Sequence, residues 1–172
     1  VVKDPAELKL LEQLAAWKGD YPVESIPATL FNQLLYDLTD AAFRPKLGDE
    51  MFKTLITTRV VDAALPRLAA AADSPWWNGQ RAATVKRAWD NSLAHLKSTC
   101  GDDPAQWQWG KAHTLTHGHP LGVKQPLDQI VNVGPFAAPG SHEVPNNLSA
   151  IIGPAPWPVT YGPSTRRLVD FA

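Results

Sequence analysis

The stretch WQWGKAHTLTHGHPLG, residues 107–122, contains two tryptophans and three histidines and follows a change in the pattern of the sequence. Before residue 102, apolar residues recur at helical spacing, whereas after it prolines and glycines interrupt the chain every few residues. This change predicts helices first and short strands afterwards. We therefore expect an α+β fold, with a helical region at residues 1–101 and a Pro/Gly-rich segment with strands at residues 102–172.

Four amphipathic helices with core-forming apolar faces are expected in the helical region. The first begins after Asp4, which can cap it while Glu7 completes a capping box, and it ends at Gly19. The other three follow from turn and cap residues: 27–44, ended by Pro45 and Gly48; from Asp49 onward, interrupted near Pro66; and from 78 or 79 to Gly101, with Val85, Trp89, Leu93 and Leu96 buried.

Short strands are expected in the second part of the chain, separated by Gly-Pro and Pro-Gly turn signals. The candidates are residues 129–133, 142–144 and 165–171. Residues 153–158 are expected to be irregular, because their prolines lack the amide hydrogens that a strand ladder needs. Asp103 and Pro104 are expected to open one short helical turn ahead of the tryptophans.

Composition excludes several classes of protein. The 172 residues suit one domain, and a net charge of −1 provides no basic field for nucleic acid. No apolar run approaches the ~20 residues that span a bilayer, and the single cysteine excludes an intrachain disulfide. Because the chain begins at Val1 and ends on a predicted strand with no closing turn, we expect a fragment of a longer polypeptide.

The histidines at 113, 117 and 119 raise the possibility of a metal site. On a helix His113 and His117 would share a face and could bind one ion, with His119 reaching from the next turn. However, the spacing departs from the HExxH motif, and no nearby carboxylate is an obvious fourth ligand. Hydrogen-bonded structural histidines are therefore favoured, with a metal-binding segment as the alternative.

The sequence contains residues that could form a catalytic site, but none of them lies in a recognisable catalytic motif. Ser164, His142 and Asp170 form a possible trio, but the residues around Ser141 do not match the G-x-S-x-G motif. Cys100 is expected at a helix C-terminus, where the helix dipole disfavours a thiolate. Arg166 and Arg167 are more easily explained by pairing with a carboxylate such as Asp170 than by substrate binding. The sequence thus assigns no catalytic, cofactor-binding or metal-binding residue.

Two ordered motifs nevertheless resemble a known family. Trp107-x-Trp109-Gly110-x-x-His113, followed by His119-Pro120-Leu121-Gly122, is similar to the W-x-W-G…H…HPL segment of the penicillin acylases. Residues 161–170, with Gly162, Pro163, Ser164, Arg166 and Asp170, resemble the G-P-S-x-R-x-x-x-D strand of the same family. Between them, residues 140–147 (Gly-Ser-His-Glu-Val-Pro-Asn-Asn) depart from the family's glycine-rich hairpin.

The resemblance implies the C-terminal part of the β chain of an N-terminal-nucleophile amidohydrolase with an αββα core. Such enzymes cut their own precursor, and the new N-terminal serine of the β chain attacks the amide of a small acyl-amine substrate. The resemblance allows several substrates: penicillins, cephalosporin side chains, acyl-homoserine lactones and lipopeptides. The implied partners are the α chain and the N-terminal part of the β chain, and no nucleic acid or membrane is expected.

The resemblance places no catalytic group in this chain. The matched positions are structural in character, and His117 matches none: Trp107, Trp109, Gly110, His113, His119, Gly162, Ser164, Arg166 and Asp170. No cofactor is expected here, since the family's calcium ligands lie outside this stretch, and the location implied is periplasmic or secreted. The isolated chain is expected to be inactive. A non-catalytic helical interaction module is the alternative, and residues 107–122 are expected to pack beneath the core strands.

Overall fold

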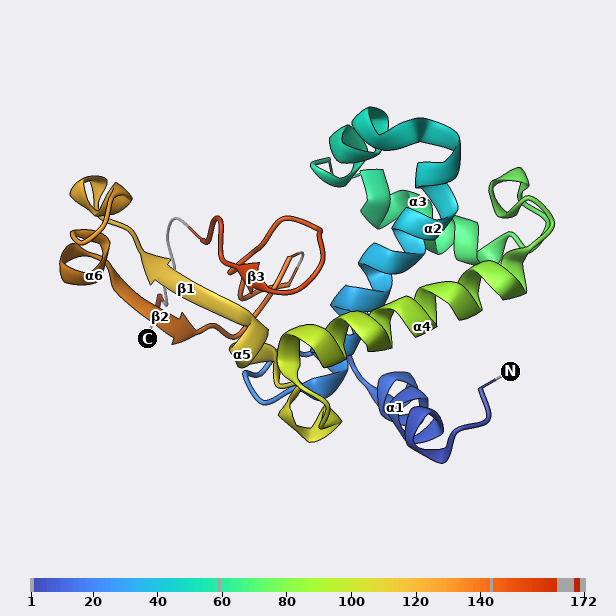
Figure 1. Ribbon diagram of the computed structural model, residues 1–172, viewed down its shortest axis with the longest axis horizontal. Coiled ribbons are helices and arrows are strands. Elements are labelled where there is room, and N and C mark those ends of the chain that lie inside the picture. The colour runs from blue at the N-terminus through green and yellow to red at the C-terminus, as the bar shows by residue number, and fades with distance from the viewer. Residues whose placement is uncertain (1, 59, 143, 164–168, 171–172) are drawn as a thin grey trace.

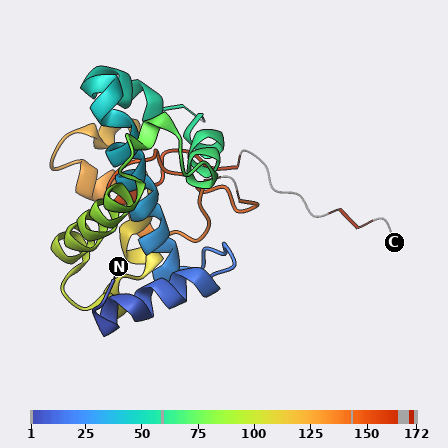
Figure 2. The same ribbon diagram turned by 90° about the vertical axis from the view of Figure 1, so that its right-hand side faces the viewer.

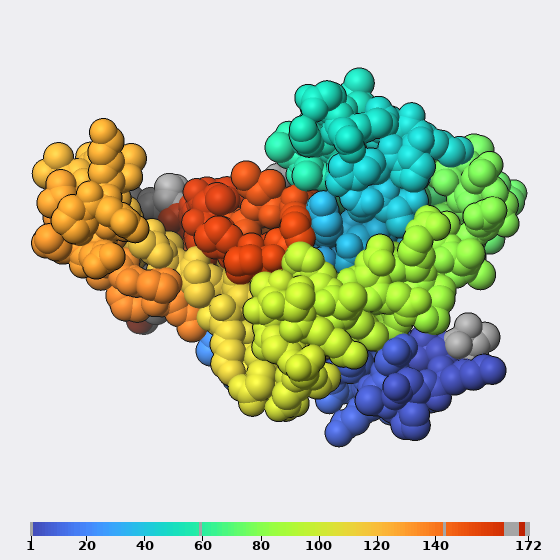
Figure 3. All heavy atoms as spheres, in the orientation of Figure 1, coloured from blue at the N-terminus to red at the C-terminus, as the bar shows by residue number. Residues whose placement is uncertain are grey.

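The computed structural model describes residues 2–58, 60–142, 144–163 and 169–170, and it confirms the α+β class (Figure 1). Helices α2 and α4 lie side by side, and α1 packs against α2 and reaches the middle of α4 (Figure 2). The β1–β2 hairpin, with α6 at its tip, extends away from the helices (Figure 3). The elements are α1 (Pro5–Ala16), α2 (Ile26–Ile56), α3 (Val60–Ala70), η1 (Pro75–Trp77), α4 (Arg81–Cys100), η2 (Pro104–Gln106), α5 (Trp109–Ala112), β1 (His113–His117), η3 (Pro120–Val123), α6 (Asp128–Val131), β2 (Val133–Ala137) and β3 (Trp157–Pro158).

Helix α2 changes direction at Gly48, where the backbone leaves helical geometry with φ 73° and ψ 173°. The predicted break between two helices is therefore found at Gly48, while Pro45 lies inside the helix. Arg44 spans the break: its Nη1 atom lies 2.9 Å from Asp49, and its guanidinium lies 4.1 Å from the centre of the Phe52 ring. These contacts join the two arms of α2 across the bend.

The predicted interruption near Pro66 was wrong, because the chain leaves the helix earlier. The hydroxyl groups of Thr57 and Thr58 donate to the carbonyl oxygens of Thr54 (2.8 Å) and Leu55 (2.7 Å). Such side-chain bonds satisfy the last carbonyls of a helix and favour its end. Helix α3 then starts at Val60 and contains Pro66.

The ends of α1 and α4 follow the predictions in part. Asp4 caps α1 by accepting from the amide of Ala6 at 2.7 Å. The Glu7 carboxylate, which was predicted to complete a capping box, instead accepts the indole N–H of Trp89 at 3.1 Å. This hydrogen bond joins α1 to α4. On α4, Trp89, Leu93 and Leu96 are buried as predicted, but Val85 is exposed. The small side chains of Ala88 and Ser92 are buried instead, and the Ser92 hydroxyl donates to Asp37 of α2 at 2.7 Å.

Two clusters of buried side chains make up the core. The first joins both parts of the chain, since Leu10, Leu30 and Trp89 from the helices belong to the same cluster as Trp109 and Trp157 from the second part. The second cluster lies around the bend of α2 and consists of Ala42, Phe43, Phe52, Val61, Leu65, Leu68 and Trp77. The helical region therefore has apolar packing of its own and also supports the small sheet.

The sheet has the order β2-β1-β3, with β2 antiparallel and β3 parallel to β1. Thr114 pairs with Ala137 and His113 with Trp157, and the β1–β2 register shifts between Leu115 and His117. The parallel strand β3 forms despite its proline, because Val159 supplies the amide that donates to Thr114 at 2.8 Å.

Most strand positions in the second part were predicted wrongly. Asp128–Val131 forms α6, and the strand near residues 129–133 begins only at Val133. His142 and Val144 are not in a strand, and Trp157–Pro158 is a strand although residues 153–158 were expected to be irregular. Of the predicted strand at residues 165–171, residues 165–168 and 171 lie outside the described residues, and 169–170 are not in a strand. The short helical turn at Pro104–Gln106 was predicted correctly.

Gly110 lies where three segments meet. A Cβ atom added there would lie 2.7 Å from the Cβ of Val23 and 2.9 Å from that of Ala137, and the Gly110 amide donates to Val23 at 2.7 Å. Only the absence of a side chain lets these backbones approach so closely.

We expect Gly110→Ala to lower the free energy of unfolding by about 1–3 kcal/mol through overpacking. Gly118→Ala is the matched control, because an added Cβ at Gly118 meets nothing within 4 Å, and it should change stability by less than about 0.5 kcal/mol. Urea unfolding followed by circular dichroism measures both. Equal midpoints for the two variants would show that the close approach at Gly110 does not matter.

Candidate functional site

The imidazole of His113 is fully buried at the start of β1. Its Nδ1 atom lies 2.8 Å from the carbonyl oxygen of Trp157, and its Nε2 atom lies 2.9 Å from that of Leu148. One face of the ring stacks on Trp109, with the centroids 4.5 Å apart and the planes at 28°. The ring is enclosed on every side by protein groups, which suits a structural role.

The two carbonyl partners of His113 make conflicting demands. A carbonyl oxygen only accepts, so both contacts are hydrogen bonds only when both ring nitrogens carry a proton. Burial disfavours that charged form and lowers the pKa of His113 below its usual value, against the raising effect of the two carbonyl groups. The neutral ring is therefore the form at pH 7, where it donates to one carbonyl.

Three tryptophans anchor the loops around this histidine. The indole N–H of Trp109 donates to Gly140, that of Trp107 to Gly101 and that of Trp157 to Gly153, each at 2.8 Å. All three side chains are buried. The first part of the 107–122 stretch thus lies in the interior, as predicted. The prediction was wrong for residues 116–121, which are exposed.

The other two histidines of that stretch do not join His113. Residues 113–117 form a strand and not the helix on which the metal hypothesis depended, and His117 is exposed. His119 is also exposed, and its Nδ1 atom accepts from the amide of Leu121 at 3.1 Å. Among the described residues, no group of three His, Cys, Asp or Glu side chains could hold a metal ion.

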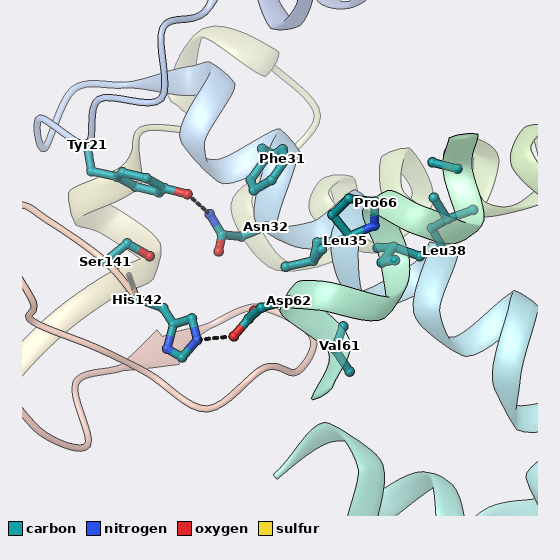
Figure 4. Close-up of a pocket in the computed structure, with 12 residues that line it drawn as sticks. Tyr21, Phe31, Asn32, Leu35, Leu38, Val61, Asp62, Pro66, Ser141 and His142 are labelled. Carbon is teal, nitrogen blue, oxygen red and sulfur yellow. Dashed lines mark hydrogen bonds and ion pairs between the residues drawn. The ribbon is translucent and has the colours of Figure 1, made fainter. Parts of the chain in front are cut away.

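The strongest candidate for a binding site is a cavity of about 370 Å³ between α2, α3 and the loop at residues 138–142 (Figure 4). Most of its wall is apolar and comes from the two helices. One end is polar and combines side chains from distant parts of the sequence. The lining residues are Tyr21, Phe31, Asn32, Leu35, Leu38, Val61, Asp62, Leu65, Pro66, Ala69, Ser141 and His142.

A pair of hydrogen-bonded side chains, His142 and Asp62, lines one side of the cavity. The Nε2 atom of His142 lies 2.8 Å from a carboxylate oxygen of Asp62 (Figure 4). Its Nδ1 atom lies 3.1 Å from the hydroxyl of Tyr161. Since both ring nitrogens have partners, His142 is not arranged as a base for the adjacent Ser141. Of the trio considered from the sequence, His142 pairs with Asp62 and not with Asp170, while Ser164 lies outside the described residues.

Tyr21, Asn32 and Ser141 form the rest of the polar end. The amide of Asn32 donates to the Tyr21 hydroxyl at 3.3 Å, and Ser141 lies beside them in the cavity wall. Burial raises the pKa of Tyr21 despite the lowering effect of Asn32 and Ser141, so the phenol keeps its proton at neutral pH. The group orients side chains and supplies no base.

The remaining nucleophile considered from the sequence is Cys100. Its side chain is partly buried at the end of α4, as expected from the sequence, and burial raises the pKa of the thiol although Lys111 opposes this. The neutral thiol is therefore favoured, which does not suit a nucleophile. Arg166 and Arg167 lie outside the described residues.

Sequence reasoning missed the cavity, because its polar groups are far apart in the chain. Asp62 and His142 are separated by 80 positions and meet only after α3 folds back over α2. One signal was present: Asn32 and Gln33 interrupt an apolar series that includes Leu30, Phe31 and Leu34. A polar residue within an apolar helix face indicates either a buried hydrogen bond or a site.

Two comparisons with known proteins bear on this chain. The family model described as penicillin amidase matches residues 2–172. No curated protein matches the sequence significantly. The match covers both the helical region, which carried no recognisable motif, and the tryptophan–histidine stretch.

The pKa of His113 predicts a pH-dependent stability. In the unfolded chain histidine titrates at about 6.5, and folding lowers this value. Between the lowered folded pKa and the unfolded pKa, the unfolded state therefore binds more protons than the folded state. The stability contributed by His113 is complete above about pH 6.5, and it is lost as the pH falls through the lowered folded pKa. We expect His113→Gln to reduce the slope of unfolding free energy against pH between 7.5 and 5.

The exposed His117 supplies the control, since His117→Gln should leave the slope unchanged. At pH 7.5 His113→Gln should also cost about 2–3 kcal/mol, through lost stacking and a carbonyl left unpaired. Denaturant titrations at several pH values measure both effects. The assignment fails if the two variants show the same slope.

Proposed function

Because this chain belongs to the penicillin amidase family, we propose that it forms part of an amidohydrolase that cleaves the bond between an acyl group and an amine. Water adds across the amide, which releases a carboxylic acid and an amine. The observation that carries the proposal is the family match over residues 2–172. It gains support from the placement of the family's motif residues Trp109 and His113 at the centre of the fold.

We assign to this chain the role of scaffold and not of nucleophile. Among the described side chains, Ser141 has no free imidazole beside it, and burial keeps the Cys100 thiol neutral. In the family the nucleophile is an N-terminal serine released by cleavage of the precursor, and another segment would supply it. Self-processing and an exported location belong to the same proposal.

Exposed apolar side chains on the β1–β2 hairpin support the presence of a partner within the same enzyme. Apolar patches of this kind mark interaction sites. A strand edge such as that of β2, exposed along its whole length, also invites pairing with another strand. We propose that the remainder of the precursor covers this surface, whose members are Leu121, Val123, Leu127, Ile130, Val133 and Phe136. No helix in the described part of the chain is both long and apolar enough to cross a bilayer.

The substrate proposed is a small acyl-amine amide, such as a penicillin or an acyl-homoserine lactone. No cofactor is proposed for the chemistry of this chain, and a calcium site would belong to other segments of the enzyme.

The proposal is tested by assaying amide hydrolysis with two proteins. The complete gene product that contains residues 1–172 should hydrolyse a phenylacetyl or fatty-acyl amide, releasing acid and amine in equal amounts. The chain of residues 1–172 alone should show no turnover. Ser164→Ala is the control in the complete product, and it should retain activity because Ser164 is not the proposed nucleophile.

Two results would overturn the proposal. Absence of hydrolysis by a folded and processed complete product would favour the non-catalytic interaction module. Turnover by the 172-residue chain that disappears with Ser164→Ala would place the nucleophile in this chain after all.

A further inference from the structure

The cavity between α2 and α3 has an apolar interior and one polar end. Its volume of about 370 Å³ lies within the range of roughly 300–1,000 Å³ that is typical of small-molecule sites. The rings of Tyr21 and Phe31 and the side chains of Leu35 and Leu38 line it. The space therefore suits a compact apolar body, such as one aromatic ring with a short side chain.

The side-chain oxygen of Asn32 is an unused acceptor at the polar end. Both amide hydrogens of Asn32 are used, one toward the carbonyl of Ala28 at 2.8 Å and one toward the Tyr21 hydroxyl at 3.3 Å. Its Oδ1 atom accepts no hydrogen bond from the residues that the structure describes. This oxygen points away from Tyr21, toward the side where His142 and Asp62 lie (Figure 4).

Asp62 supplies a second acceptor and a negative charge. Its Oδ2 atom is bound by His142 at 2.8 Å, whereas Oδ1 has no hydrogen-bond partner within the described part of the chain. The carboxylate side chain is 30% exposed, so a ligand in the cavity can reach it. Ser141 and Tyr21 are the other polar side chains here, and the Tyr21 hydroxyl already accepts from Asn32.

We propose that this cavity binds a small primary amine, with its apolar body between α2 and α3 and its ammonium group donating to Asn32 Oδ1 and Asp62 Oδ1. An ammonium group offers three N–H donors and a charge opposite to that of Asp62. A carboxylate would bring further acceptors and a like charge to the same end. A neutral alcohol has one donor and would leave an acceptor unpaired.

The inference concerns binding and is independent of amide hydrolysis, so the two can fail separately. Isothermal titration calorimetry at pH 7 compares three probes of similar size on the chain of residues 1–172: 2-phenylethylamine, 2-phenylethanol and phenylacetate. We expect the amine to bind at least about tenfold more tightly than the alcohol, because one additional charge-assisted hydrogen bond increases affinity by about this factor. Phenylacetate should show no saturable binding.

A variant pair locates the site. Asp62→Asn removes the charge and should weaken amine binding by at least about tenfold while leaving the weak alcohol binding within about twofold. Asp73→Asn removes one exposed carboxylate elsewhere, for which no hydrogen bond is found, and should leave binding of all probes unchanged. Thermal unfolding of each variant checks that the fold is kept.

Three outcomes would overturn the proposal. The first is no saturable binding of the amine by the unmodified chain, and the second is binding of phenylacetate as tight as that of the amine. These two comparisons need no variant, so they decide the proposal even if Asp62→Asn fails to fold. The third is equal amine affinity in folded Asp62→Asn and Asp73→Asn, which would place the binding elsewhere.

Discussion

The buried imidazole of His113 is the point on which the second half of the molecule depends. One small ring contacts the carbonyl groups of Leu148 and Trp157, residues that lie 35 and 44 positions further along the chain. The stack on Trp109 fixes the plane of the ring, and the Trp109 indole in turn holds Gly140. Segments with little regular structure are thereby held by side-chain bonds where a larger sheet would use backbone ladders.

The close approach at Gly110 connects this histidine-centred cluster to the helices. Its amide reaches Val23, and the neighbouring Trp109 amide reaches Ser25 at 3.0 Å, so the loop ahead of α2 is bound directly to α5. The same region carries Tyr21, which lines the cavity and accepts from Asn32. Packing of the tryptophan–histidine stretch and shaping of the cavity are thus parts of one arrangement, although His113 itself does not line the cavity.

The cavity also depends on a break in the helices. Because Thr57 and Thr58 end α2, α3 can fold back so that Val61, Asp62 and Leu65 face the α2 side chains Leu35 and Leu38. The Asp62–His142 pair then joins α3 to the loop that follows β2. A helix that continued through residue 58 would carry Asp62 away from His142 and leave no enclosed space.

The sequence by itself determined the α+β class, the helices with their apolar faces, the break at Gly48 and the family, because these follow from local periodicity, caps and motif spacing. It placed the strands poorly: the hairpin register and the β1–β3 pairing rest on contacts between residues more than 15 positions apart, which local propensity does not encode. Tertiary structure alone decided that His113 is enclosed while His117 is exposed, and that Asn32, Asp62 and His142 share one cavity. Those outcomes come from long-range packing, since only the folded chain brings α3 and the loop after β2 against the same face of α2.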